Sequence, residues 1–200
     1  MRAEKKSFLI IFVAAVALVV ACSRGSRNNS EVVSARVREA NKVATRAVTL
    51  YFESPDLVLV PEKRNVALPE SDVAAVSTVV RELLAGSSNA AVARSFPKDA
   101  ALRGAFLLSD GTAIIDLGGD TLATGWNTGS HEELMAVYSL VQTLMDNFPS
   151  VKRVRILVNG QPAPTLAGHV AIDHALKPLT WLVAAQPPAP AAPQPPQEGR

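Results

Sequence analysis

The segment from Ser130 to Gly160 places the strongest constraint on the fold, because it combines a long amphipathic helix with a strand that follows it. Ser130 followed by Glu133 predicts a capping box at the start of the helix, and Pro149 predicts its end. The apolar side chains at helical spacing are Leu134, Val137, Tyr138, Val141, Leu144, Met145 and Phe148. Burial of this face would contribute on the order of 10–20 kcal/mol before opposing terms are subtracted. No other segment offers as large a packing face.

The first part of the folded region predicts one strand and one helix. Residues 47–52 alternate in polarity and are rich in strand formers, and two short extended pieces follow at 57–60 and 65–68, on either side of a proline. A helix is expected from Ser71, with Gly86 just past its end. Its apolar stripe comprises Val73, Val76, Val80, Leu83 and Leu84.

Turn signals mark the remaining strands. Asp110-Gly111 between two apolar runs predicts a hairpin, and Asn159-Gly160 predicts a turn before a last short strand at 163–172 and an extended piece at 179–183. The expected order is β-α-β-β-α-β-β. We therefore expect an α+β fold, with a small mixed β-sheet and two amphipathic helices packed on one face.

The N-terminus has the layout of a bacterial lipoprotein signal. Basic residues between positions 2 and 6 precede an apolar run at 8–20, and a small residue stands directly before Cys22. Cys22 is the only cysteine, so it forms no intrachain disulfide, and at a mature N-terminus it would carry the lipid. The alternative is an uncleaved membrane anchor, for which the apolar run is short, since a span needs about 20 residues. Ser23, in place of an aspartate, favours the outer membrane in a Gram-negative cell.

Four parts are expected along the chain: a signal peptide at 1–21, a lipidated cysteine and polar tether at 22–46, the α+β domain at 47–183, and a tail at 184–200. The tail is rich in Pro, Ala and Gln and cannot bury a core. Removal of residues 1–21 takes away three basic residues and one acidic residue, which leaves 17 of each. A nucleic-acid binder would keep a basic excess on its folded part, so we exclude that class. The tether has a local basic excess, which either attracts anionic lipid or belongs to a solvated linker.

Several segments of residues 47–180 together resemble the GerMN family, a module of bacterial sporulation and spore-germination proteins. They are residues 48–52, 59–64, 80–86, 96–98, 114–117, 129–133, 141–144, 151–160 and 166–169. The resemblance implies an exported, non-enzymatic module that acts in envelope protein assemblies, often on a lipoprotein. In architecture the family resembles small α/β domains that build rings in secretion systems. This chain has one copy of the module, so the sporulation role does not follow.

No catalytic motif stands out, and we expect neither an enzyme nor a cofactor. Met135 occupies the position four residues after His131, so the paired-histidine zinc motif is absent. Glu132 and Glu133 are expected to favour the helix dipole. The best metal candidates are His169, Asp173 and His174; on a strand the first two would point to one side and the third to the other. A metal-assisted envelope hydrolase using these three residues is the alternative function.

The predicted partner surface is the glycine-rich loop 118–129 with nearby sheet edges, and its candidate contact residues are Trp126, Asn127 and Thr128. Tryptophan is enriched at binding hot spots, although Trp126 would equally fill space over the sheet. Asp116 and Asp120 either are ordinary turn residues or order this loop, and Trp181 is expected to pack the C-terminal piece onto the domain.

The sequence therefore predicts a lipid-anchored extracytoplasmic module that binds or scaffolds envelope proteins. Its partners would be the membrane, through lipid on Cys22, and one or more envelope proteins, but no nucleic acid. A cell-wall ligand binder is a further alternative, which the scarcity of aromatic residues disfavours.

Overall fold

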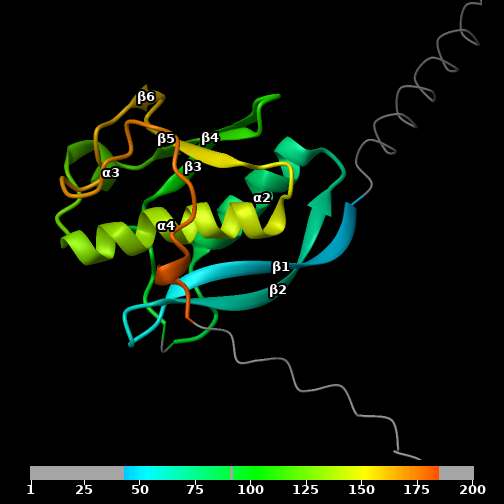
Figure 1. The fold of residues 1–200 in the computed structure, drawn as a ribbon, viewed down its shortest axis with the longest axis horizontal. Helices are drawn as coiled ribbons and strands as arrows, with labels where there is room; N and C mark the ends of the chain where they lie inside the picture. Colours follow the sequence, from blue (N-terminus) through cyan, green and yellow to red (C-terminus); the bar gives the residue numbers. More distant parts are fainter. Residues whose placement is uncertain (1–42, 91, 185–200) are drawn as a thin grey trace, which may run out of the picture. The chain divides into compact units, whose positions relative to one another are not determined.

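The structure is a computed structural model, and it describes residues 43–90 and 92–184 (Figure 1). The expected signal peptide, Cys22, most of the tether and the tail from residue 185 lie outside the described residues. The chain divides into two compact units, one of residues 1–44 and 69–71, the other of residues 45–68 and 72–200. Of the smaller unit only residues 43–44 and 69–71 are described, and they belong to strand ends and a short bend. The rest of the description concerns the larger unit.

A two-stranded sheet opens the domain, formed by β1 (Val43–Glu53) and β2 (Leu59–Pro69). A hydrogen bond from the Ser54 N–H to the Val58 carbonyl, 2.9 Å long, closes the turn between them. The two extended pieces expected around Pro61 are therefore one strand. Pro61 is tolerated because, among the described residues, β1 is the only strand that pairs with β2. Leu59 lies two residues before Pro61, so its backbone groups point to the same edge of β2. At that edge the Leu59 carbonyl accepts the Ala184 N–H at 2.9 Å.

A second sheet has four strands in chain order: β3 (Ala101–Leu107), β4 (Thr112–Gly118), β5 (Arg153–Val158) and β6 (Gln161–Pro162). β4 pairs antiparallel with β3 and parallel with β5, and β5 pairs antiparallel with β6. Both turns predicted from the sequence are confirmed. Asn159 and Gly160 adopt φ values of 51° and 77°, as Asn-Gly does in the two-residue turns that suit a hairpin.

Two main helices, α2 (Asp72–Ala85) and α4 (Ser130–Asn147), lie between the four-stranded sheet and the β1–β2 hairpin (Figure 1). A short helix, α3 (Asp120–Thr124), precedes α4 and lies inside the segment expected to be a loop. The parallel β4–β5 pair requires a crossover connection, which α3 and α4 supply. The α+β class is confirmed. Over the described residues, the expected order and single sheet are corrected to β-β-α-β-β-α-α-β-β in two sheets, because β2 is a full strand that pairs with β1 and not with the four-stranded sheet.

α4 is buried on more than the one face predicted from its apolar spacing. Its buried residues are Glu133, Met135, Ala136, Val137, Ser139, Leu140, Val141, Thr143 and Leu144. On one side, α4 packs against the four-stranded sheet in the main core. On another side Met135 joins a second buried cluster with Tyr51 of β1, Leu59 of β2 and Leu182. On α2 the expected stripe is buried except for Val73, which is 38% exposed.

Side chains of α4 bond to one edge of β1 as a neighbouring strand would. The Asn147 amide accepts the Thr49 N–H at 2.9 Å and donates to the Thr49 carbonyl at 2.7 Å. One helical turn earlier, the Thr143 hydroxyl accepts the Tyr51 N–H at 3.0 Å. These bonds satisfy backbone groups of β1 that would otherwise remain unpaired, and they fix the hairpin against the helix.

The C-terminal part of the domain is mostly irregular, so the strand expected at 163–172 is wrong. β6 is only two residues long, and the later pairing is a single bridge between Leu176 and Val154, with hydrogen bonds of 2.7 and 2.9 Å. A 3₁₀ turn, η1 (Thr180–Leu182), follows. Residues 166–170 do not need a strand partner, because a carboxylate from α4 accepts four of their N–H groups, as described below, and the Thr165 hydroxyl accepts that of Gly168.

Candidate interaction surface

The outward face of the four-stranded sheet carries large apolar side chains in water. Along each strand alternate residues point to opposite faces, and the inward set, including Ala105, Ile115 and Ile156, is buried in the main core. On the outward face, Phe106 stands opposite Ile114, which stands opposite Arg155 on β5. Phe106 is 58% exposed and Leu108, past the end of β3, is 46% exposed.

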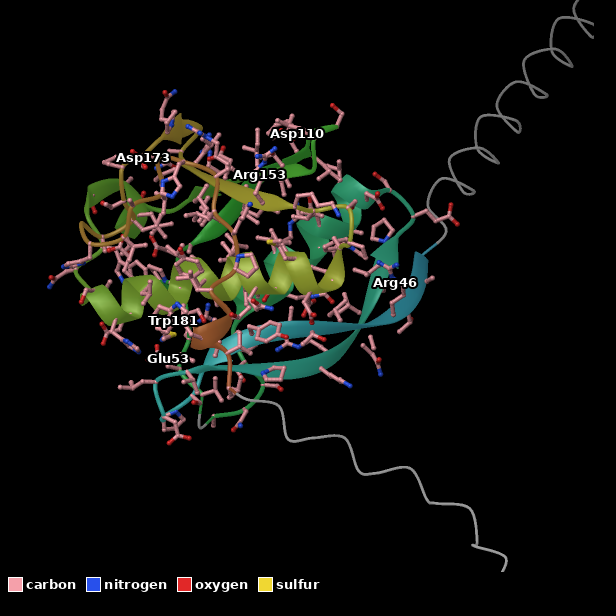
Figure 2. All side chains as sticks on the ribbon, in the orientation of Figure 1. Arg46, Glu53, Asp110, Arg153, Asp173 and Trp181 are labelled. Carbon is pink, nitrogen blue, oxygen red and sulfur yellow. The ribbon has the colours of Figure 1, made fainter. Side chains whose placement is uncertain are left out.

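Charged residues border this apolar row. Arg153 donates to Asp110 at 2.9 Å and to the Thr112 hydroxyl at 2.9 Å, beside the β3–β4 turn (Figure 2). Hydrogen bonds from Thr112, together with the charge of Arg153, lower the pKa of Asp110. Arg155 forms no salt bridge among the described residues, although its charge helps to lower the pKa of Asp173. We define the outer sheet face as Phe106, Leu108, Ile114, Arg153 and Arg155.

This face was not predicted from the sequence, although the sequence carries a signal for it. Residues 105–108 read Ala-Phe-Leu-Leu without a polar break. An uninterrupted apolar run of this kind presents apolar side chains to both faces of a sheet. Only one face is covered by α2 and α4, so the run leaves Phe106 in water.

The loop 118–129, predicted as the partner surface, is held by more packing and hydrogen bonds than its glycines suggest. Trp126 is half-buried and packs against the main core, in line with the alternative hypothesis that it fills space over the sheet. Asn127 is exposed and Thr128 is half-buried. Thr128 N–H donates to the Trp126 carbonyl at 3.0 Å. Asp99 accepts the Thr121 N–H at 2.8 Å and so orders the start of α3.

Asp116 has a different role from both of the alternatives considered for it. Its carboxylate is nearly buried, at 9% exposure, and accepts the Gly160 N–H at 2.7 Å. It also lies 3.3 Å from Arg103. Asp116 therefore holds the β5–β6 turn, not the loop at 118–129.

Glu133 is fully buried and does not form the predicted capping box. The N-cap of α4 is Gly129, and no side chain caps the helix there. Instead the Glu133 carboxylate accepts four backbone N–H groups: Leu166 and Ala167 at 2.8 Å each, His169 at 2.7 Å and Val170 at 3.1 Å. Burial would raise the pKa of Glu133, but these backbone hydrogen bonds lower it below its ordinary value. The carboxylate is thus the anion of a small backbone nest that organises the 166–170 loop.

The three residues of the metal hypothesis do not share one site: His169 pairs with Glu133, whereas Asp173 and His174 pair with each other. His169 Nδ1 lies 3.1 Å from the Glu133 carboxylate, and His174 Nδ1 lies 2.9 Å from Asp173 on an exposed part of the surface. Within residues 43–90 and 92–184, no three side chains of ligand type are grouped so that they could hold an ion.

Two further expectations concern the ends of the domain. Trp181 does not pack the C-terminal piece onto the domain, since it is 68% exposed (Figure 2); the neighbouring Leu182 is buried and makes that contact. Cys22 lies outside the described residues. In the part of the chain that is described, no helix has the length and apolar character of a membrane span.

The fold and its surface define a small α+β domain with an exposed apolar sheet face. The family model for sporulation and spore germination, named Germane, matches residues 49–164. That match covers more than half of the chain, so the chain belongs to this family, and the resemblance found in the sequence is confirmed. No curated protein matches the chain.

A solved structure with low sequence identity shows the same fold. The tandem GerMN domains of the sporulation protein GerM from Bacillus subtilis align with a TM-score of 0.54 and 19% identity, over 70% of this chain and 48% of that one. The first GerMN domain of the same protein aligns with a TM-score of 0.45 and 21% identity, over 66% of this chain and 98% of that one.

Proposed function

We propose that this chain is a lipid-anchored, non-enzymatic module that binds or scaffolds proteins in the bacterial cell envelope. Membership of a sporulation and germination family supports an envelope role. The N-terminal pattern ending at Cys22 supports export and lipid attachment. The lipid would hold the domain on the outer surface of a cytoplasmic membrane or, in a Gram-negative cell, on the outer membrane facing the periplasm.

The outer sheet face is the observation that carries the binding role. Phe106 and Leu108 expose large apolar side chains side by side on a face that α2 and α4 do not cover. Apolar surface gains about 25 cal/mol per Å² when a partner removes it from water, and aromatic residues and arginine are enriched at protein interfaces. Arg155 borders the apolar row in the position of an interface rim. The proposed partner is therefore a protein that presents an apolar patch.

The test of this function is recovery of partners from the protein's own envelope. The full chain, crosslinked in cells and purified, is compared by mass spectrometry with a chain that keeps residues 1–46 but lacks 47–183. Proteins recovered only with the domain support the proposed function. If both chains recover the same proteins at the same abundance, the domain is not a binding module.

A further inference from the structure

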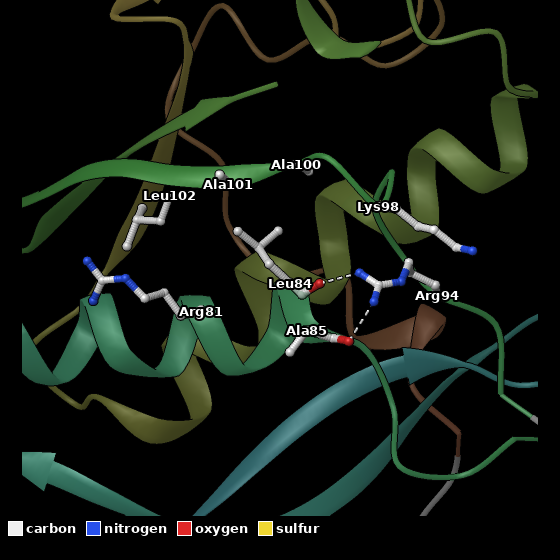
Figure 3. Close-up of a pocket in the computed structure, with 8 residues that line it drawn as sticks. All are labelled: Arg81, Leu84, Ala85, Arg94, Lys98, Ala100, Ala101 and Leu102. Atoms are coloured by element: carbon white, nitrogen blue, oxygen red, sulfur yellow. Dashed lines mark hydrogen bonds between the residues drawn. The ribbon is translucent and has the colours of Figure 1, made fainter. Parts of the chain in front are cut away.

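A basic pocket lies between the end of α2 and the start of β3, away from the outer sheet face. It has a volume of about 340 Å³ and is lined by Arg81, Leu84, Ala85, Arg94, Lys98, Ala100, Ala101 and Leu102 (Figure 3). Buried Leu84 and half-buried Leu102 supply apolar lining. Arg81 and Lys98 lie on opposite sides of Leu84 in this view, with the Arg94 guanidinium between them (Figure 3).

The positive charge of this pocket is not balanced from within the described chain. Arg94 donates to the carbonyls of Leu84 and Ala85, at 2.6 and 2.8 Å, so it caps the end of α2 without meeting a carboxylate. Arg81 and Lys98 form no ion pair with the described residues.

The acidic residues next in sequence to these cations have other partners. Glu82 pairs with Arg64 at 2.9 Å. Asp99, beside Lys98, accepts the Thr121 N–H. Three cations therefore share one pocket without an acidic partner, although the chain after residue 21 has as many acidic as basic residues.

A strand edge forms one wall of the same pocket. Ala101 and Leu102 begin β3, which is the terminal strand of its sheet and, in the described part of the chain, pairs with β4 alone. An unpaired edge offers N–H and C=O groups to an added extended segment, and this is a common way in which domains bind peptides. Alternate side chains of such a segment would point the same way, so acidic residues two apart would face the cations.

From this juxtaposition we propose that the pocket binds an extended acidic segment of a partner protein, which adds to the β3 edge and places its carboxylates near Arg81, Arg94 and Lys98. This site rests on the proposed function, because it names the chemistry of one partner of the module. It uses different residues from the outer sheet face, so the two proposals fail separately.

The probe is a synthetic eight-residue peptide of alternating Val and Glu, titrated against the full chain in detergent by calorimetry or fluorescence anisotropy. Binding is expected to weaken as salt rises, since the attraction is between exposed charges. Arg81→Gln and Lys98→Gln are each expected to weaken it about 3- to 10-fold, the loss typical of one charged contact of about 1 kcal/mol. Lys63→Gln, which removes an exposed cation from β2, is the matched control and should leave binding unchanged.

Several results would overturn the site. They are no binding of the peptide at millimolar concentration, equal weakening by Lys63→Gln, or equal binding of an alternating Val-Lys peptide. Displacement of the peptide by inorganic phosphate at equal concentration would also overturn it, because it would show a site for small anions. If the peptide binds but no envelope partners are recovered, the pocket stands and the proposed function is wrong. If envelope partners are recovered but the peptide does not bind, the proposed function stands and the pocket is wrong.

Discussion

The Glu133 carboxylate is fully buried and accepts the backbone N–H of His169 at 2.7 Å. The two residues are 36 positions apart in the chain. Three further N–H groups from the same loop converge on this carboxylate. The contact fastens an irregular C-terminal loop to the first turn of α4, the longest of the described helices.

Replacing Glu133 with Gln should destabilise the domain. The amide puts an NH₂ group where the native oxygen accepts backbone N–H donors, so buried donors lose their acceptor. Hydrogen bonds to charged groups are the stronger ones, and we expect a loss of about 3 kcal/mol in the free energy of unfolding. Urea unfolding of the full chain in detergent measures it. Glu132→Gln, on the same turn but exposed, should change stability by less than about 0.5 kcal/mol; equal effects of the two variants would contradict this role.

Acid should destabilise the protein partly through Glu62. Burial opposes ionisation there, but hydrogen bonds from Ser87, Arg64 and Ser88 lower the pKa of Glu62 from 4.5 to about 2. Since the carboxylate has the lower pKa in the folded state, its contribution is complete above about pH 4.5 and is lost as pH falls toward 2. The difference corresponds to at most about 3 kcal/mol.

The measurement for Glu62 is the urea midpoint as a function of pH. Glu62→Gln should be less stable than the parent at pH 7 and should lose less stability between pH 4.5 and 2. A variant whose pH profile runs parallel to that of the parent over this window would show that Glu62 does not carry the effect.

Asn147 should matter for the β1–α4 contact more than its half-exposed position suggests. Asn147→Ala removes the partner of both the Thr49 N–H and its carbonyl, and the expected cost is about 2 kcal/mol. Asn147→Asp keeps the acceptor for the N–H and loses only the donor, so it should fall between the parent and the alanine variant. Hydrogen exchange adds a local readout: the Thr49 amide should lose protection in Asn147→Ala and keep it in Asn147→Asp. Unchanged protection in the alanine variant would rule out the contact.

Lipid attachment predicts a specific effect of Cys22→Ser. The parent should partition into the detergent phase and yield a lipidated N-terminal peptide by mass spectrometry, because acyl chains contribute about 0.8 kcal/mol per buried CH₂. The serine variant should carry no lipid mass and should not be processed before residue 22. Unchanged maturation and membrane attachment of Cys22→Ser would remove the lipoprotein proposal.

Local chemistry explains which parts of the fold the sequence predicted. Asp110-Gly111 and Asn159-Gly160 are turn signals because Asn and Gly reach left-handed φ values at low cost, as Gly111, Asn159 and Gly160 do here. Both turns are where they were expected. The apolar spacing of 130–148 likewise identified α4. The second buried side of that helix was missed, because Ser139 and Thr143 are polar residues whose hydroxyls bond to backbone within the fold.

The remaining features depend on residues far apart in the chain. Glu133 resembles a capping residue locally, and only the fold brings Leu166 and His169 to it; backbone N–H donors leave no side-chain signal in a sequence. The same limit applies to the basic pocket, where Arg81 and Lys98 are 17 positions apart and are joined by the packing of α2 beneath β3.

The most direct test of the account is partner recovery by a chain that carries Phe106→Ser and Leu108→Ser. Both side chains are on the outer sheet face and exposed, so the double variant should keep the stability of the parent to within about 1 kcal/mol. Leu57→Ser is the matched control, because Leu57 is as exposed as Phe106, at 58%, but belongs to the β1–β2 turn. We predict that proteins crosslinked to the parent are recovered with the Leu57 variant and lost with the double variant. Full recovery with a folded double variant would contradict the assignment of the outer sheet face as the binding surface.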